Sequence, residues 1–431
     1  HTRYISVTGS SDVCSSDLKA SGGQGPRAPG PHTVHKAMNP WKDETTLLVT
    51  CPKALPPYLG QELRDLGMDG VRELVSGVEC RGTLSDCLKL NLELRTGHRV
   101  LYELARFRAP GPDQLYAEAG KIPWEELIPA DGYVSVSSAL RTEAVRDSRF
   151  ANLKLKDALV DRIAARKGRR PDSGPEQDRS CVFLYWQGSD AAVYLDATGD
   201  SLSRRGWRTM PGKAPLQETL AAGMLLAAGW PGIAAQGGRF LDPMCGSGTL
   251  AVEAAHLAQD RAPGLARENF AFMHVPGYRH RVWEGLLRAA EERVRDLAEG
   301  RFLATDKDPA QMAACHQNAT RAGVDELLRT RVCDFRDLDV APGPGLAIMN
   351  PEYGVRLGDE GPLRETYKAL GDFLKQRCQG WRAAVLCGNP DLAKHVGLKP
   401  SRRIPFWNAK IECRLLVYEL YEGSRKRRDG S

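Results

Sequence analysis

Four consecutive residues, Asn350-Pro351-Glu352-Tyr353, follow directly after the apolar run 346–349. The Asn350 side-chain oxygen and the Pro351 carbonyl oxygen can accept the two hydrogens of an amine on a planar ring, and Tyr353 can stack on that ring. The lone pair of the amine would then point at an activated carbon, so that catalysis would consist mostly of alignment. Taken alone, Asn-Pro-x-Tyr is equally typical of a plain turn.

A glycine-spaced turn, Leu-Asp-Pro-Met-Cys-Gly-Ser-Gly-Thr at 241–249, lies between a short apolar run and an apolar helical pattern. Gly246 and Gly248 let the backbone approach a ligand closely, and the N–H groups at the start of the helix suit a carboxylate. The spacing fits neither the P-loop nor the Gly-x-Gly-x-x-Gly dinucleotide motif. The residues of this turn that we predict to bind a cofactor are Asp242, Pro243, Cys245, Gly246, Ser247, Gly248 and Thr249.

Two further strands are expected to end in acids. Asp306 follows the apolar run 302–305, where a carboxylate can accept hydrogen bonds from both hydroxyls of a ribose. Asp334 ends a third short strand and is a candidate acceptor for an adenine amino group, with an ordinary strand-end carboxylate as the equal alternative. Asp308 and Pro309 predict the N-cap and first residue of a helix. This order of strands and helices is typical of a doubly wound α/β sheet.

These motifs give the chain a family resemblance. It resembles the THUMP-containing class I RNA methyltransferases, and most closely the bacterial 23S ribosomal RNA guanine-N2 methyltransferase group, over about residues 45–420. Besides the glycine turn and Asn-Pro-x-Tyr-Gly at 350–354, the matching segments are Leu-Ser-Arg-Arg-Gly-Trp-Arg at 202–208, Ala-Pro-Leu-Gln-Glu-Thr-Leu-Ala-Ala at 214–222 and Asp-Arg-Ala-Pro-Gly-Leu at 260–265.

The resemblance implies an α/β fold, with a class I (Rossmann-like) methyltransferase domain preceded by an α+β ferredoxin-like and THUMP RNA-binding region. It also implies S-adenosylmethionine as cofactor, 23S ribosomal RNA or a large-subunit assembly particle as partner, and guanine N2 as the methylated atom. Asn350, Pro351 and Tyr353 would then be the catalytic residues. Some relatives carry a second methyltransferase domain at the C-terminus.

Two alternatives stay open at this point. One keeps the chemistry but makes transfer RNA the substrate, since THUMP domains occur with both kinds of RNA. The other is a catalytically silent RNA-binding or ribosome-assembly protein. Glu352 bears on the second, because it stands where the family commonly has another proline. We expect Glu352 to face solvent; the alternative is that it accepts hydrogen bonds from guanine N1–H and N2–H.

The chain is expected to fold as three domains between two tails. We predict a disordered or artefactual tail at 1–44, a ferredoxin-like segment at 45–110, a THUMP domain at 111–200, the methyltransferase domain at 201–423 and a basic tail at 424–431. Residues 7–18 look like a translated sequencing adapter, so the natural start is expected at Met38. The insertion 258–300, helical over 282–299, is expected to cover the methyltransferase sheet, with a role in shaping the RNA site as the alternative.

Local patterns place the elements of the first two domains. In the ferredoxin-like segment they predict strands at 47–49 and 71–78 around a helix at 61–66. In the THUMP segment they predict strands at 133–136, 181–186 and 191–195, with a helix at 153–165 after the first of them.

Basic residues cluster in the THUMP segment and just after it. Residues 141–170 hold ten Lys or Arg residues against four acids, and the whole chain has a formal net charge of +6. Such a patch suits a phosphate backbone, although a solvated helix face has the same appearance. The predicted RNA-binding residues are Arg141, Arg149, Lys154, Lys156, Arg204, Arg205 and Arg208.

Composition excludes several other classes of protein. The 431 residues, 42% of them hydrophobic, suffice for two or three packed domains. The 11 cysteines form no Cys-x-x-Cys pair and have no clustered histidines, so we expect no metal site and no disulfide framework. We expect Cys245 to be a packing residue. No apolar run approaches the length of a membrane span. We therefore expect a cytoplasmic protein.

Overall fold

The computed structural model describes residues 39–210, 216–354 and 360–421. These residues form two compact units. The first unit contains the described residues up to 202 together with 267–287, and the second contains 203–266 and those from 288 onward. The expected adapter-like segment, Met38 and the expected basic tail lie outside the described residues. Residues 39–44, which we assigned to the tail, are among the described residues, and Pro40 is buried with its carbonyl oxygen accepting a hydrogen bond from the Leu84 N–H (2.8 Å).

The first unit is built on one sheet of eight strands, in the order β2-β3-β1-β4-β8-β7-β5-β6. Antiparallel pairing of β4 with β8 joins the expected ferredoxin-like and THUMP segments into this single sheet. The single strand predicted at 71–78 is wrong, because a turn divides it into β2 and β3. The strands are β1 (Thr45–Thr50), β2 (Asp69–Glu73), β3 (Gly77–Gly82), β4 (Arg99–Arg108), β5 (Tyr133–Arg141), β6 (Asp172–Ser173), β7 (Ser180–Gln187) and β8 (Asp190–Asp196).

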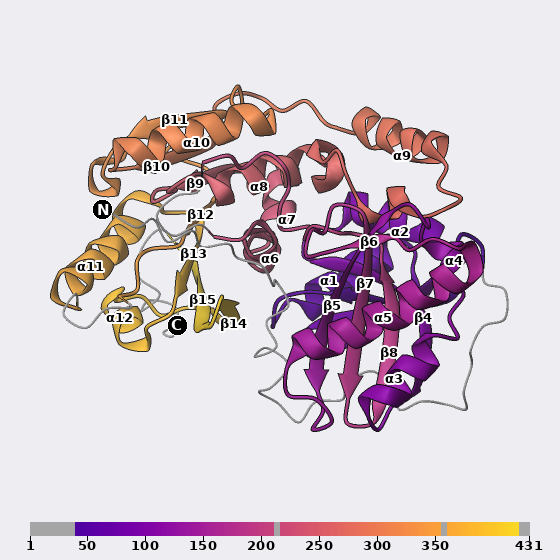
Figure 1. Ribbon diagram of the computed structural model, residues 1–431. Coiled ribbons are helices and arrows are strands. Elements are labelled where there is room, and N and C mark those ends of the chain that lie inside the picture. The colour runs from indigo at the N-terminus through magenta and orange to yellow at the C-terminus, as the bar shows by residue number, and fades with distance from the viewer. Residues whose placement is uncertain (1–38, 211–215, 355–359, 422–431) are drawn as a thin grey trace, which may run out of the picture. The chain divides into compact units, whose positions relative to one another are not determined.

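Helix α5 (Ser148–Lys167) is the longest helix of the first unit and packs on β5 (Figure 1). Its N-cap is Asp147, whose side chain accepts a hydrogen bond from the Arg149 N–H, and Gly168 ends it in the left-handed conformation with a φ of 69°. The prediction of a helix at 153–165 is confirmed, and the helix extends five residues further at its N-terminal end and two at its C-terminal end. The other helices of this part are α1 (Pro56–Asp65), α2 (Leu84–Glu93), α3 (Pro112–Ala119) and α4 (Trp124–Leu127).

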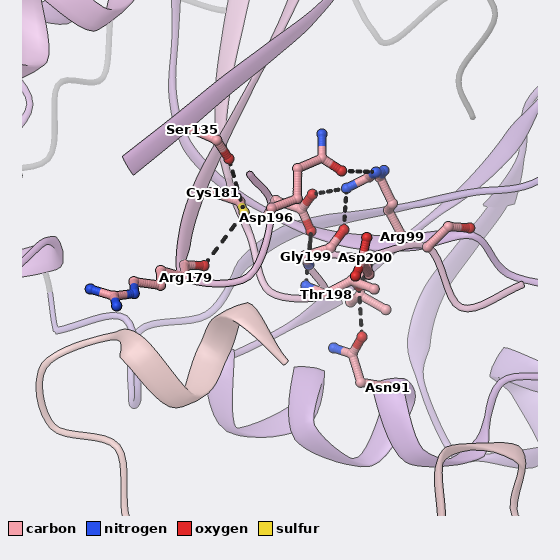
Figure 2. Close-up of polar contacts among 12 residues, drawn as sticks. Asn91, Arg99, Ser135, Arg179, Cys181, Asp196, Thr198, Gly199 and Asp200 are labelled. Atoms are coloured by element: carbon pink, nitrogen blue, oxygen red, sulfur yellow. Dashed lines mark hydrogen bonds and ion pairs between the residues drawn. The ribbon is translucent and has the colours of Figure 1, made fainter. Parts of the chain in front are cut away.

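A buried polar cluster joins the start of β4 to the end of β8 (Figure 2). The Arg99 guanidinium donates to the Asp196 carboxylate (2.6 Å) and to the Gly199 carbonyl oxygen. Thr198 donates its hydroxyl to Asn91 of α2 (2.6 Å) and accepts from the Val100 N–H (2.8 Å). Because every charge in this cluster has a partner, the ion pair is buried without leaving an isolated charge.

Residues 267–287 return to the first unit after the chain has entered the second. The 3₁₀ helix η2 (Ala271–His274) is attached to the end of β8, because Phe272 N–H donates to the Ala197 carbonyl oxygen (3.0 Å). Phe270 and Phe272 stack, and Trp283 packs edge-on against both rings. For residues 267–287, the expectation that the insertion covers the methyltransferase sheet is therefore wrong. Helix α9 (His280–Glu292) is shorter than the helix predicted at 282–299, and the boundary between the units falls inside it.

The second unit is built on a sheet of seven strands, in the order β11-β10-β9-β12-β13-β15-β14. The first five are parallel, and β15 pairs antiparallel with both β13 and β14. The predicted order of a doubly wound sheet is confirmed. The strands are β9 (Arg239–Asp242), β10 (Phe302–Asp306), β11 (Leu328–Val332), β12 (Gly345–Met349), β13 (Arg382–Cys387), β14 (Arg402–Asn408) and β15 (Ile411–Glu419).

Helices pack against this sheet around two apolar cores, and Figure 1 shows α10 beside β10 and β11. Trp230 packs edge-on against Phe240 and Phe302 in one core, while Tyr367 and Leu370 of α11 lie in the other. The helical elements are α6 (Glu218–Ala227), α7 (Trp230–Ala235), α8 (Thr249–Gln259), η1 (Pro263–Ala266), α10 (Pro309–Ala322), η3 (Phe335–Asp337), α11 (Glu360–Arg377) and α12 (Pro390–His395).

Within the described ranges, no helix has the length and apolar character that crossing a membrane requires.

Gly371 of α11 lies so close to α12 that a β-carbon would overlap the Val396 carbonyl oxygen. We expect Gly371→Ala to lower the free energy of unfolding by about 2 kcal/mol, because neither backbone can yield without moving a helix. Gly361, in the same helix, has open space at this position, so Gly361→Ala should be neutral or stabilising by up to about 1 kcal/mol. Urea unfolding of both variants measures the difference, and equal stabilities would contradict the expected close contact.

Candidate active site

The parallel order of the second sheet brings the carboxyl ends of β9, β10 and β12 to one edge. The glycine turn after β9 is attached there to the end of β10. Cys245 N–H donates to the Thr305 carbonyl oxygen (2.9 Å), and Gly246 N–H donates to Asp306 Oδ2 (3.0 Å). Two of the sequence motifs, 60 residues apart along the chain, are thus in direct contact.

The two glycines of the turn adopt backbone angles that other residues avoid. Gly246 has a φ of 53° and Gly248, which is the N-cap of α8, has a φ of 87°. A β-carbon on Gly248 would lie 2.6 Å from Cys315 Sγ in α10, so a side chain there would push the turn away from its neighbour helix. This explains the glycines by conformation and by packing, independently of any ligand.

Asp306 is positioned to accept further hydrogen bonds. Each of its two oxygens already accepts one backbone hydrogen bond, Oδ2 from Gly246 and Oδ1 from the Asp308 N–H (3.0 Å). A carboxylate offers about four lone-pair sites, so each oxygen has room for one more donor, and the side chain is half-buried. Asp308 itself caps α10 through Ala310 N–H (2.9 Å), and Pro309 is the first helical residue, which confirms that prediction.

Asp242 has a different environment from Asp306. Its side chain is 1% exposed, and Oδ1 accepts a hydrogen bond from the Met244 N–H (3.3 Å). Burial raises the pKa of this carboxyl well above its usual range, and the nearby Asp306 adds to the increase. In the structure, Asp242 is therefore a buried residue that supports the glycine turn through its hydrogen bond from the Met244 N–H.

Cys245 is buried in contact with sulfur-containing neighbours. Its Sγ lies 3.6 Å from Met312 Sδ, and both residues are buried. The contact with Cys315 and the burial raise the pKa of the Cys245 thiol well above its usual range. A thiol in such surroundings stays protonated and unreactive. This supports the interpretation of Cys245 as a packing residue.

Asp334 ends the connection after β11 and is already engaged. It is the N-cap of η3, where it accepts from the Arg336 N–H (3.0 Å), and it forms an ion pair with the Arg336 side chain (3.1 Å). Its side chain is partly exposed. The structure thus gives Asp334 a local structural role, and its contact with an adenine amino group stays a prediction.

Asn350 follows β12 and carries the most informative polar atom of the edge. Its Oδ1 is buried and accepts no hydrogen bond from any residue that the structure describes. Burying an acceptor without a partner is costly unless a ligand supplies the donor. Pro351 is buried beside it, whereas Glu352 is exposed, in agreement with its expected orientation toward solvent.

Tyr353 is half-buried at the same edge and is fixed from two sides. Its hydroxyl accepts a hydrogen bond from the Asn408 side-chain amide at the end of β14. Its ring lies against the backbone at Gly388, where a β-carbon would be 2.9 Å from Tyr353 Cδ2. Burial raises the pKa of the tyrosine hydroxyl to about 12, so the ring stays neutral at physiological pH.

Sequence reasoning missed both Asn408 and Gly388. Asn408 lies 55 residues after Tyr353, and their contact depends on the pairing of β13, β15 and β14. The only local signal was Gly388 itself, a glycine directly after the apolar strand 382–387.

Two of the predicted RNA-binding arginines have internal roles instead. Arg205 is 2% exposed, and its Nε lies 3.3 Å from the buried Glu253 carboxylate of α8. Arg208 is paired with Glu218 (2.8 Å) and donates to the Thr249 hydroxyl (2.8 Å) at the start of the same helix. Neither guanidinium is available to an RNA backbone in this structure. Of the three arginines predicted in this segment, Arg204 alone is exposed.

The basic residues on and beside α5 are partly neutralised by acids. Lys154 pairs with Asp113 (3.6 Å), Lys156 with Asp157 (2.9 Å) and the exposed Arg149 with Asp147 (2.9 Å). Such surface pairs contribute little to stability and leave the cations able to exchange partners. Phe150 and Leu153 of α5 are exposed beside them, so apolar and basic side chains alternate on the first turns of this helix.

Family profiles match three consecutive parts of the chain. The profile described as RlmL ferredoxin-like domain matches residues 46–101, that of the THUMP domain matches 112–196, and that of the RMKL-like methyltransferase domain matches 205–416.

Individual proteins agree with these profiles. The chain is 42% identical over 380 residues to a protein of Syntrophotalea carbinolica named ribosomal RNA large subunit methyltransferase K/L, covering 86% of this chain and 53% of that protein. The chain thus spans about half the length of the curated relatives it matches.

Solved structures share the fold over almost the whole chain. A possible methylase from Clostridium difficile 630 is 26% identical with a TM-score of 0.79, over 89% of this chain and all of that one. The putative methyltransferase SMU.472, crystallised with SAH, has the same TM-score and coverage at 24% identity. From the order of the three profiles and the identity to these relatives, the chain belongs to the THUMP-containing, RlmL-like methyltransferases.

Proposed function

We propose that this protein transfers a methyl group from S-adenosylmethionine to the exocyclic N2 of a guanine in 23S ribosomal RNA. The buried, unpartnered Oδ1 of Asn350 carries the proposal, because it is an acceptor without a donor at the edge where α/β sheets bind ligands. The relatives' name, ribosomal RNA large subunit methyltransferase K/L, supports the choice of RNA. The choice of guanine N2 follows the family resemblance.

The residues at this edge fit the cofactor. The glycine turn offers backbone N–H groups at the start of α8, which suit the methionine carboxylate. Asp306 retains acceptor capacity on both oxygens for the two ribose hydroxyls. When bound, the cofactor supplies a sulfonium methyl group that is already activated.

The protein's own contribution would be to hold and orient the base. Asn350 Oδ1 and the Pro351 carbonyl oxygen would accept the two N–H hydrogens of the guanine amine, which directs its lone pair along the line of transfer. Tyr353 would stack on the ring, with its position fixed by Asn408 and Gly388. An intact acceptor at Asn350 and an intact Asp306 argue against a catalytically silent protein.

The first unit would bind the RNA outside the target base. Its THUMP part exposes Phe150 and Leu153 among Arg149 and the other cations of α5, a combination that suits stacked bases and phosphates. We propose the cytoplasm as the site of action, in line with ten cysteines that are all free thiols among the described residues.

We expect Asn350→Ala to reduce methyl transfer to unmodified 23S ribosomal RNA by on the order of 100-fold or more, because the amine loses an acceptor that aligns it. Scintillation counting of labelled methyl groups, followed by nucleoside analysis of the product, measures the effect. Calorimetry should show unchanged binding of S-adenosylmethionine, which controls for folding. The neighbouring Glu352→Gln should keep wild-type turnover, since Glu352 is exposed. Full activity of Asn350→Ala, or label appearing only in transfer RNA, would refute the proposal.

We expect Asp306→Asn to weaken S-adenosylmethionine binding by roughly 10- to 100-fold, because an amide replaces a charged acceptor and turns a donor toward either the Gly246 N–H or the Asp308 N–H. Isothermal titration calorimetry measures the dissociation constant. Asp308→Asn is the matched control, since asparagine caps a helix as well as aspartate does. Equal affinities in the two variants would mean that Asp306 only holds the glycine turn.

We expect Asn408→Ala and Tyr353→Phe to lower kcat by similar factors of about 10, because each removes the hydrogen bond that orients the tyrosine ring. The double variant should be no worse than either single variant, since the two side chains act as one unit. A double variant whose loss equals the product of the single losses would show that Asn408 acts independently of Tyr353.

A further inference from the structure

A cavity opens beside the proposed active site, within the second unit. It has a volume of about 500 Å³ and lies between α12 and the β14–β15 hairpin, next to the end of β13. This volume is in the range of sites that bind small molecules. Gly388 lines the cavity, and its backbone also contacts the Tyr353 ring. The cavity is therefore next to the tyrosine that is proposed to stack on the base.

One of the residues that line the cavity has a buried hydroxyl without a partner. Tyr418 of β15 lines it and is 1% exposed, and its hydroxyl forms no hydrogen bond with any described residue. A buried hydroxyl is normally paired, because leaving it unpaired costs more than a typical hydrogen bond contributes. Filling the cavity with a ligand that carries a polar atom would satisfy it.

Cations surround the cavity. Lys394, Arg403 and Arg414 line it, against the single carboxylate of Glu412. Glu412 is paired with Arg414 (2.7 Å), and Lys394 is paired with Asp391 (2.7 Å). Arg403 has no ion-pair partner within the described part of the chain. Its guanidinium is therefore the cation most available to an anionic ligand.

The rest of the lining is apolar. Leu398, Pro400 and Leu416 contribute apolar surface next to the cations. A ligand that fits should therefore combine a negative charge, a polar edge and an apolar surface. A nucleotide has all three, and RNA is the substrate that the proposed function already requires.

We propose that this cavity binds a nucleotide of the RNA that flanks the methylated base, with its phosphate on Arg403 and a polar edge at the Tyr418 hydroxyl. The inference rests on the proposed function for the identity of the RNA. It adds a second contact point at the same sheet edge, which would fix the direction in which the strand enters the active site.

The test compares three single variants of the full chain. Arg403→Gln removes the free cation and Tyr418→Phe removes only the hydroxyl. Arg402→Gln is the matched control, because Arg402 is the neighbouring exposed arginine on β14 and does not line the cavity. The measurements are kcat and KM for unmodified 23S ribosomal RNA, and the dissociation constant of that RNA in the presence of S-adenosylhomocysteine over a range of salt.

We expect Arg403→Gln to raise the KM for RNA about 10-fold. The slope of log Kd against the logarithm of the salt concentration should become smaller by the contribution of about one phosphate contact. Arg402→Gln should leave both values unchanged. Tyr418→Phe should raise KM several-fold while keeping or raising the melting temperature, since it removes a buried unpaired hydroxyl. A purely structural role of Tyr418 would leave KM where it is.

Two results would overturn the inference. One is that Arg403→Gln and Tyr418→Phe match Arg402→Gln in KM and in salt slope. The other is that Arg403→Gln weakens binding of free guanosine monophosphate, measured by calorimetry, but leaves the KM for RNA unchanged, which would assign the cavity to a free nucleotide. Because RNA binding is measured without turnover, absence of methylation by the wild type would refute the proposed function and leave the cavity's test intact.

Discussion

The parallel pairing of β9 between β10 and β12 is the constraint on which the second unit depends. Parallel strands end at the same edge, so the turns that follow them must meet there, however distant they are in sequence. Gly246 and Asp306 meet in this way, and Asn350 reaches the same edge from β12. The helices of this unit support the arrangement by covering the sheet with apolar side chains, such as Trp230 of α7 and Tyr367 of α11.

The sequence predicted this unit well because its signals are local. An apolar strand, a polar turn and an amphipathic helix follow one another within about 20 residues, and caps such as Asp308 mark where the helices begin. In the first unit the same reasoning found most elements but merged β2 and β3, because it read the apolar residues Leu74 and Val75 as part of one strand and overlooked the turn signal Ser76-Gly77 that follows them. The pairing of β4 with β8 left no local trace, so the single eight-stranded sheet was not expected.

The site was predicted only where its residues follow strands directly. Asn350, Tyr353 and Asp306 stand at strand ends and were found, whereas Asn408 acts from an antiparallel hairpin far along the chain. For the arginines, sequence reasoning instead predicted a contact with RNA where the structure shows contacts inside the protein. A run of Arg204, Arg205 and Arg208 around Trp207 has the composition of a nucleic-acid contact, yet two of the three are bound to buried carboxylates of α6 and α8. Charge composition does not distinguish a cation that faces water from one that holds two helices in place.

The return of residues 267–287 to the first unit makes both units discontinuous in sequence. A fragment that begins at residue 203 would contain the entire methyltransferase sheet, but it would also carry Phe270, Phe272 and Trp283 without the strand ends that receive them. A fragment that ends at 202 would leave the matching surface on the first sheet uncovered. Dividing the protein between residues 202 and 203 would therefore expose apolar surfaces that favour aggregation on both fragments. A soluble catalytic fragment requires that residues 267–287 be removed or replaced.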